Sequence, residues 1–314
     1  MQRFKNILLV AENTSDFSPA FVRAGELAER NGAVVTVIHV LEALPRDIQI
    51  LASAVPLDDL IDIAVGERTG QLERLVEPMR KVDVAVNVRV LCGSPFIEII
   101  REVLREQRDL VIMTTEGKPA LGEFLFGSTS MHLMRKCPCP VWVTKPGPHT
   151  SYARVLAAVD PMAHDNSHDS LNVKIMQLAT SLARSDGSEL HVVHAWLPIT
   201  EKISGLGSRL SSDEIEKVVD DTRHAHETAF ASLLKRSELD GLNVELHIVN
   251  GAASEIIPHL AKSKQIDVIV MGTVCRTGVA GLFIGNTAEK VLRQVDCSVL
   301  TVKPEGFVTP VTLE

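Results

Sequence analysis

The chain repeats itself, and this duplication constrains its fold more than any other feature of the sequence. A repeat of this length is a whole domain rather than the short unit of a solenoid. At 314 residues, the chain can hold two such domains, each long enough to bury its own core. We therefore predict domains at 1–147 and 151–304 and a tail at 305–314. Four pairs of identical residues are separated by 158 positions: Asp109 and Asp267, Gly127 and Gly285, Cys139 and Cys297, and Lys145 and Lys303.

Each repeat alternates strands with helices. The apolar run 268–271 is typical of a strand buried on both faces. A glycine-bearing loop follows it, then a helix with Asn286 or Thr287 as its expected N-cap, and then a strand at 298–302. The segments upstream follow the same alternation, with five strands and four helices in the first repeat. We predict an α/β fold of two tandem domains, each a five-stranded parallel sheet with helices on both faces.

The last strand–loop–helix segment has the features of an anion site. Glycines let the backbone approach a ligand closely, and the N–H groups and dipole at a helix N-terminus favour phosphate. The candidate residues of this segment are Met271, Gly272, Gly278, Gly285, Asn286 and Thr287.

Composition excludes several classes of function. A net charge of −8 argues against general nucleic-acid binding, which usually relies on a basic face of the protein. No apolar run approaches the roughly 20 residues of a membrane span, and the N-terminus lacks a signal-peptide core. Five cysteines, an odd number, fit reduced thiols better than a disulfide framework. We expect a cytoplasmic protein that binds neither nucleic acid nor membrane.

Several of these motifs together resemble the universal stress protein family. They are Asp160-Pro161, His39-Val40 and the spaced glycines that end in Gly285-Asn286, and the resemblance covers essentially the whole chain. It implies an adenine nucleotide alpha hydrolase-like, Rossmann-like fold. It also implies that the two domains pair through their last strands as an internal pseudo-dimer, with a further homodimer left open.

ATP-binding members of this family carry a phosphate loop written Gly-x2-Gly-x9-Gly-Ser/Thr. In the first domain Gly117, Gly127 and Ser128 match it, whereas Thr114 replaces the opening glycine. In the second domain Gly272 and Gly285 match, whereas Cys275 replaces the middle glycine and Asn286 the serine. Cys275 adds a Cβ and a thiol where the backbone would approach phosphate.

The resemblance also implies two positions near the nucleoside. An acid follows the first strand, which is Glu12 in the first domain and Asp160 in the second. The residue after the histidine of the second strand is Val40 or Ala195. The implied ligand is ATP, with Mg²⁺ as a candidate companion ion and the second domain favoured.

Two functions therefore compete. The first is a stress-response regulator that binds an adenine nucleotide, acts on unidentified protein partners and hydrolyses ATP slowly at most, because no motif supplies a base. The second is a scaffold or a binder of another small molecule, which Thr114 and Cys275 favour. The glycines would also serve a tight loop that holds no ligand, and Asp160 and Glu12 would also serve as helix caps.

Histidines and cysteines give weaker signals. His191 and His194 lie three apart on one strand, so they point to opposite faces and cannot share a metal. We expect His224 and His226 to be solvated, and Cys137 and Cys139 to be buried thiols. By residue type, the best metal cluster comprises His164, Asp165, His168 and Asp169.

Overall fold

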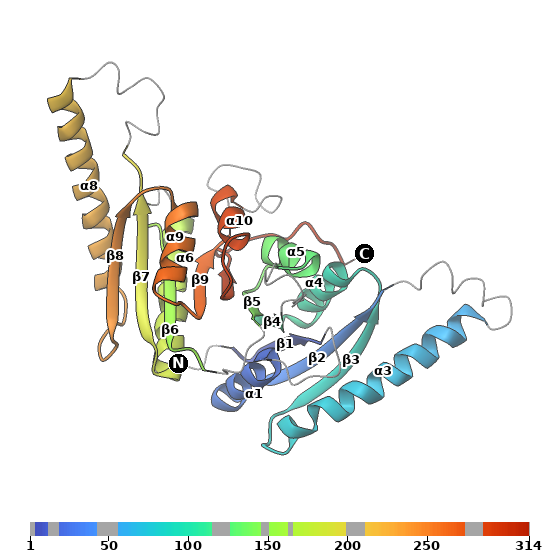
Figure 1. Ribbon diagram of the computed structural model, residues 1–314. Coiled ribbons are helices and arrows are strands. Elements are labelled where there is room, and N and C mark those ends of the chain that lie inside the picture. The colour runs from blue at the N-terminus through green and yellow to red at the C-terminus, as the bar shows by residue number, and fades with distance from the viewer. Residues whose placement is uncertain are drawn as a thin grey trace. The chain divides into compact units, whose positions relative to one another are not determined.

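The computed structural model describes residues 4–11, 19–42, 56–114, 126–145, 151–162, 166–198, 211–273 and 285–313. These residues form two compact units. The first comprises the described residues up to 145 and those from Val308 onward, and the second comprises those from Ser151 to Phe307. In both units strands alternate with helices along the chain, as Figure 1 shows.

Within its described residues, the first unit is a parallel sheet with the strand order β3-β2-β1-β4-β5. Asn6 of β1 lies beside Val34 of β2, and Ile7 lies beside Leu110 of β4. The elements are β1 (Asn6–Val10), α1 (Pro19–Asn31), β2 (Val34–Leu41), α3 (Leu57–Arg80), β3 (Val86–Cys92), α4 (Pro95–Glu106), β4 (Leu110–Thr114), α5 (Ser128–Lys136) and β5 (Val141–Thr144).

The described part of the second unit repeats this arrangement, with the strand order β10-β9-β6-β7-β8 and every pair parallel. Each strand occupies the place of its counterpart in the first unit, so the predicted α/β fold of two tandem domains with parallel strands is confirmed. The elements are β6 (Arg154–Ala158), α6 (Asn166–Asp186), β7 (Glu189–Trp196), α8 (Ser212–Lys235), β8 (Val244–Asn250), α9 (Ala253–Ser263), β9 (Val268–Gly272), α10 (Asn286–Leu292) and β10 (Ser298–Val302).

Burial follows the position of each strand in its sheet. The inner strands β1, β4, β6 and β9 are almost wholly apolar and buried, because helices cover both of their faces. Strands β3 and β8 lie at the end of their sheets and largely alternate between exposed and partly buried residues. The apolar run that predicted β9 therefore marks a strand inside the sheet, and alternation marks an outer one.

The C-terminal residues from Val308 pack with the first unit rather than the second. Arg101 of α4 donates a hydrogen bond from Nε to the carbonyl oxygen of Thr312, at 3.0 Å. None of the helices described here combines the length and the apolar character that crossing a bilayer requires.

Candidate functional site

The residues expected near a ligand in the second unit gather at one edge of its sheet. Parallel strands all present their carboxyl ends at the same edge, where ligands bind in open α/β sheets. Ala158 at the end of β6 lies beside Val193 of β7 and Met271 of β9. Two residues further along each chain segment are Asp160, Ala195 and Thr273. The register thus brings Asp160 and Ala195 level with each other and close to Met271 and Gly272.

The turn that carries Asp160 is fixed by a buried asparagine of α6. Asn172 accepts a hydrogen bond from the backbone N–H of Asp160 at 2.9 Å and donates one to its carbonyl oxygen at 2.8 Å. This side chain is 4% exposed, so the pair of bonds lies in the core. Asn172 sets the direction in which the chain leaves β6. This role of Asn172 was not predicted from the sequence, although its neighbour Leu171 begins an apolar helix face.

A histidine near the end of the second strand makes the same bond in both units. Nδ1 of His39 lies 2.6 Å from the carbonyl oxygen of Ala11, and Nδ1 of His194 lies 3.3 Å from that of Val159. A carbonyl oxygen only accepts, so Nδ1 carries the proton. Burial lowers the pKa of His39, although the bond to Ala11 opposes this. These histidines fix the chain just before the acid positions, Glu12 and Asp160.

His194 also contacts a second histidine. Its Nε2 lies 2.7 Å from Nδ1 of His226, so His226 donates to His194, which in turn donates to Val159. His226 is 6% exposed, so the prediction that it is solvated is wrong. It belongs to the buried face of α8 with Phe230 and Leu233, at helical spacing. His224 lies on the exposed face of α8, as expected.

Helix α10 begins beside the end of β9. The backbone N–H of Gly285 donates to the carbonyl oxygen of Thr273 at 3.1 Å, which joins the helix start to the strand end. The N-cap is Gly285 in an extended conformation, so the expectation of Asn286 or Thr287 as N-cap is wrong. Asn286 and Thr287 are instead the first helical residues, and both are exposed. Tight closure of the chain at Gly285 selects the cap here, rather than a capping side chain.

Two polar residues at this edge, Lys303 and Thr273, were not predicted from the sequence as site residues. Lys303 directly follows β10 and is 2% exposed. Its ammonium group donates to the hydroxyl of Thr273 and lies 4.9 Å from the ring centroid of Phe307. The edge therefore includes a buried cation, which favours an anionic ligand nearby. The matching Lys145 of the first repeat was a signal for it.

Gly272 has a packing role of its own. A Cβ built at this position would lie 2.8 Å from Cδ2 of Leu171 on α6, closer than real Cβ atoms come to other side chains. The contact between strand and helix thus favours a glycine here, whether or not a ligand binds.

The first unit places its candidates at the equivalent edge. Val40 is buried near the end of β2, Gly127 is the N-cap of α5, and Ser128 is the exposed first residue of that helix. Thr114, the counterpart of Gly272, has its hydroxyl 3.3 Å from that of Thr144. The remaining candidates lie outside the described residues: Glu12, Gly117, Cys275 and Gly278.

The metal cluster expected from residue types is described only in part. Asp169 binds Arg236 through both carboxylate oxygens, at 2.7 and 2.8 Å, and this hydrogen bonding lowers the pKa of Asp169. Its carboxylate is therefore already engaged by a guanidinium. His164, Asp165 and the side chain of His168 lie outside the described residues.

Elsewhere, Cys137 is buried and Cys139 partly buried, with their sulfurs 3.5 Å apart as separate thiols.

Comparison with known proteins agrees with the duplicated fold. The model of the Universal stress protein family matches residues 3–145 and again 151–303. Universal stress protein E of Salmonella typhi is 30% identical over 318 residues, which cover 100% of this chain and 99% of that protein. Universal stress protein E of Escherichia coli K12 is 30% identical over 319 residues, which cover 100% and 98%.

Solved structures show the same architecture. A putative universal stress protein from Pseudomonas aeruginosa UCBPP-PA14 is 25% identical and has a TM-score of 0.68, covering 98% of this chain and 95% of that one. A universal stress protein from Archaeoglobus fulgidus is 19% identical with a TM-score of 0.61, covering 94% and 98%. The chain belongs to the Universal stress protein family, as two tandem copies of its domain.

Proposed function

We propose that the second unit binds an adenine nucleotide, with ATP as the first candidate, and that its occupancy regulates protein partners in the stress response. The observation that carries this proposal is the hydrogen bond between Gly285 and Thr273. It holds the start of α10 at the carboxyl edge of the sheet, the edge that Asp160 and Ala195 also occupy. Strand ends beside a helix N-terminus are the arrangement that α/β proteins use for nucleotides.

Each candidate residue has a chemical role in this proposal. The Asp160 carboxylate accepts hydrogen bonds from the ribose hydroxyls, and Ala195 leaves room for the base. The backbone of Met271 and Gly272 lines the path toward the phosphates. Backbone N–H groups of Gly285, Asn286 and Thr287, together with that of Gly278, donate to phosphate oxygens.

The cation Lys303 and a bound Mg²⁺ would share the neutralisation of the phosphate charge. We propose slow hydrolysis at most, because positioning and charge neutralisation are the contributions that these residues offer. The equivalent residues of the first unit would form a weaker site. They are Glu12, Val40, Gly117, Gly127 and Ser128.

One observation favours the alternative, a scaffold or a binder of another small molecule. Gly272 packs closely against Leu171, so a glycine at this point has an explanation without a phosphate. The match of Gly272 to the phosphate loop therefore carries less weight than the position of Gly285.

The test is identification of the small molecules released when the purified protein is denatured, by mass spectrometry, followed by calorimetric titration with ATP and Mg²⁺. We expect one adenine nucleotide per chain and a loss of binding in Gly285→Val. Gly127→Val changes the equivalent position of the first unit and is the matched control. An empty protein that does not respond to ATP contradicts the nucleotide proposal.

A second variant addresses the departure from the family loop. Cys275→Gly restores the middle glycine, and we expect ATP to bind it more tightly than the wild-type chain. An unchanged affinity would mean that position 275 does not face the ligand.

The internal pseudo-dimer and a cytoplasmic location are further parts of the proposal. The unlinked thiols of Cys137 and Cys139 support a reducing compartment. Sedimentation analysis separates one chain with two paired units from a further homodimer, and cell fractionation tests the location.

A further inference from the structure

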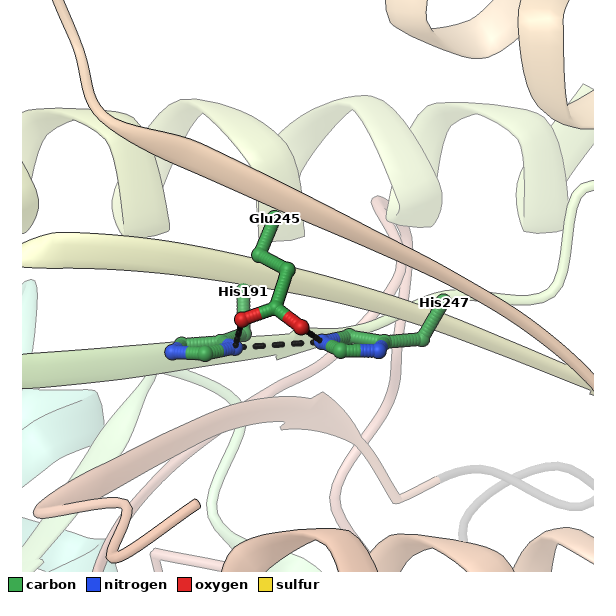
Figure 2. Close-up of side chains that lie close together, drawn as sticks. All are labelled: His191, Glu245 and His247. Carbon is green, nitrogen blue, oxygen red and sulfur yellow. Dashed lines mark hydrogen bonds and ion pairs between the residues drawn. The ribbon is translucent and has the colours of Figure 1, made fainter.

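Two strands of the second unit place three metal-binding side chains together, on the side of β7 opposite to His194. His191 of β7 lies beside Glu245 of β8 in the parallel register. His247 follows Glu245 by two residues, so it points to the same face of β8. Figure 2 shows the Glu245 carboxylate above the line that joins the two imidazole rings.

The distances within this cluster are close to those of a metal site. Nδ1 of His191 lies 3.1 Å from Nε2 of His247 and 3.5 Å from Oε2 of Glu245. Nε2 of His247 lies 3.8 Å from Oε1 of Glu245. Ligands at roughly 2.0–2.1 Å from a tetrahedral zinc ion are separated from each other by about 3.3 Å. The three groups thus need small movements to surround one ion.

Both histidines of this cluster are largely buried. The side chain of His191 is 1% exposed and that of His247 is 11% exposed. Burial lowers the pKa of both, although Glu189 and Glu245 oppose this for His191 and Glu245 opposes it for His247. Neutral imidazole is the form that binds metal ions, so a lowered pKa favours binding.

The groups around the cluster suit the outer shell of a metal site. Nε2 of His191 is buried without a hydrogen-bond partner among the described residues, and Oε2 of Glu189 lies 3.6 Å away. When Nδ1 binds a metal, Nε2 carries the proton and, on a slightly closer approach, donates a hydrogen bond to Glu189, as metal-binding histidines do to carboxylates. Lys264 lies 2.6 Å from Oε1 of Glu245, which leaves Oε2 for the ion.

From this geometry we propose that His191, Glu245 and His247 bind one Zn²⁺ ion, with water as the fourth ligand. Two histidines and one glutamate are a common zinc donor set. In the metal-free chain the two imidazoles are nearly parallel, at 7°, and one proton joins Nδ1 to Nε2. When zinc binds between these two nitrogens, that proton moves to the other nitrogen of its own ring, both imidazoles stay neutral, and the rings rotate until both lone pairs point at the ion. The site joins the outer strand β8 to β7.

The test is calorimetric titration of the metal-free full-length protein with Zn²⁺ in competition with a chelator of known affinity. We expect one tight site per chain. Because ligands contribute more than outer-shell partners, which give about 10–100-fold, we expect His247→Gln to weaken it by at least about 100-fold. Glu189→Gln removes the outer-shell carboxylate and should weaken it by about 10-fold. His224→Gln, on the exposed face of α8, is the matched control and should bind as the wild type does.

A second readout does not depend on affinity. Zinc that binds only the folded chain raises its melting temperature, and this rise should disappear in His247→Gln and in Glu245→Gln. Glu245 is 40% exposed, so its variant keeps the fold and the test remains decisive. The absence of a tight site in the wild type, or equal affinity in His247→Gln, overturns the proposal.

Discussion

The two units have the same strand order but different interiors where a helix packs beside the next strand. In the first unit Glu102 of α4 and Arg108 form an ion pair at 2.6 Å, with side chains 1% and 5% exposed. At the equivalent positions, 158 residues later, the second unit has the buried residues Leu260 and Ile266. One fold therefore accepts either a buried charge pair or an apolar contact at this joint. Buried ion pairs often stabilise no more than the hydrophobic residues that could replace them.

The largest expected loss of stability comes from removing one partner of this ion pair. Arg108→Ala leaves the Glu102 carboxylate buried, with the half-exposed Arg89, 3.2 Å away, as its remaining cation among the described residues. We expect the free energy of unfolding of the first unit to fall by about 3 kcal/mol, within the range of about 3–5 kcal/mol for such losses. Urea denaturation followed by circular dichroism measures the change.

The paired control replaces both charged residues of the first unit with the apolar residues that the second unit has at the equivalent positions. Glu102→Leu combined with Arg108→Ile removes both charges and should be as stable as the wild type, or more stable. If the double variant loses as much stability as Arg108→Ala, the two joints are not interchangeable and the comparison fails.

A smaller loss of stability is expected from substitutions at Gly272 and Thr114, which occupy equivalent positions in the two units. Gly272→Ala places a Cβ against Leu171, and overpacking of this kind costs about 1–3 kcal/mol. Thr114→Ala in the first unit should cost less, because it removes one hydroxyl contact with Thr144. Thermal denaturation of both variants checks the order. Adding Leu171→Ala to Gly272→Ala should remove the clash, and a purely additive loss would show that the contact is not its cause.

The smallest effect concerns pH and the buried histidines of both units. Burial lowers the pKa of His39 in the first unit and of His191 and His247 in the second. The unfolded chain therefore binds more protons than the folded one. Their contribution to stability is complete above the unfolded pKa of about 6.5 and falls as the pH decreases toward the lower folded pKa.

Melting temperatures measured across this range with a chelator present should decline on the acid side. His39→Gln should make the decline shallower, whereas His224→Gln, which changes an exposed histidine, should leave it unchanged. A wild-type melting temperature that is constant below about pH 6.5 would contradict the prediction.

The fold could be predicted because its signals are local. Apolar runs mark the inner strands, helical spacing marks the helices, and the offset between the repeats shows that both halves fold alike. The buried role of His226 was also readable, since Phe230 and Leu233 follow it at intervals of four and three residues.

The rest of the site depends on contacts between segments distant in sequence. The cluster of His191 with Glu245 and His247 requires the register of β7 against β8, which neither strand encodes alone. Asn172 likewise acts on Asp160 from a different element. Gly285 replaced the expected N-cap because its bond to Thr273 depends on where the chain returns to the sheet, not on capping preference.

That same bond between Gly285 and Thr273 has a consequence for how such proteins diverge. The bond joins the two ends of the segment that lies between these residues in the sequence. Strand β9 and helix α10 are therefore held together whatever residues that segment contains. Lengthening a closed loop is inexpensive, at about 0.6 kcal/mol for each doubling. The number of residues between positions 273 and 285 can therefore differ among relatives at little cost to the stability of the sheet.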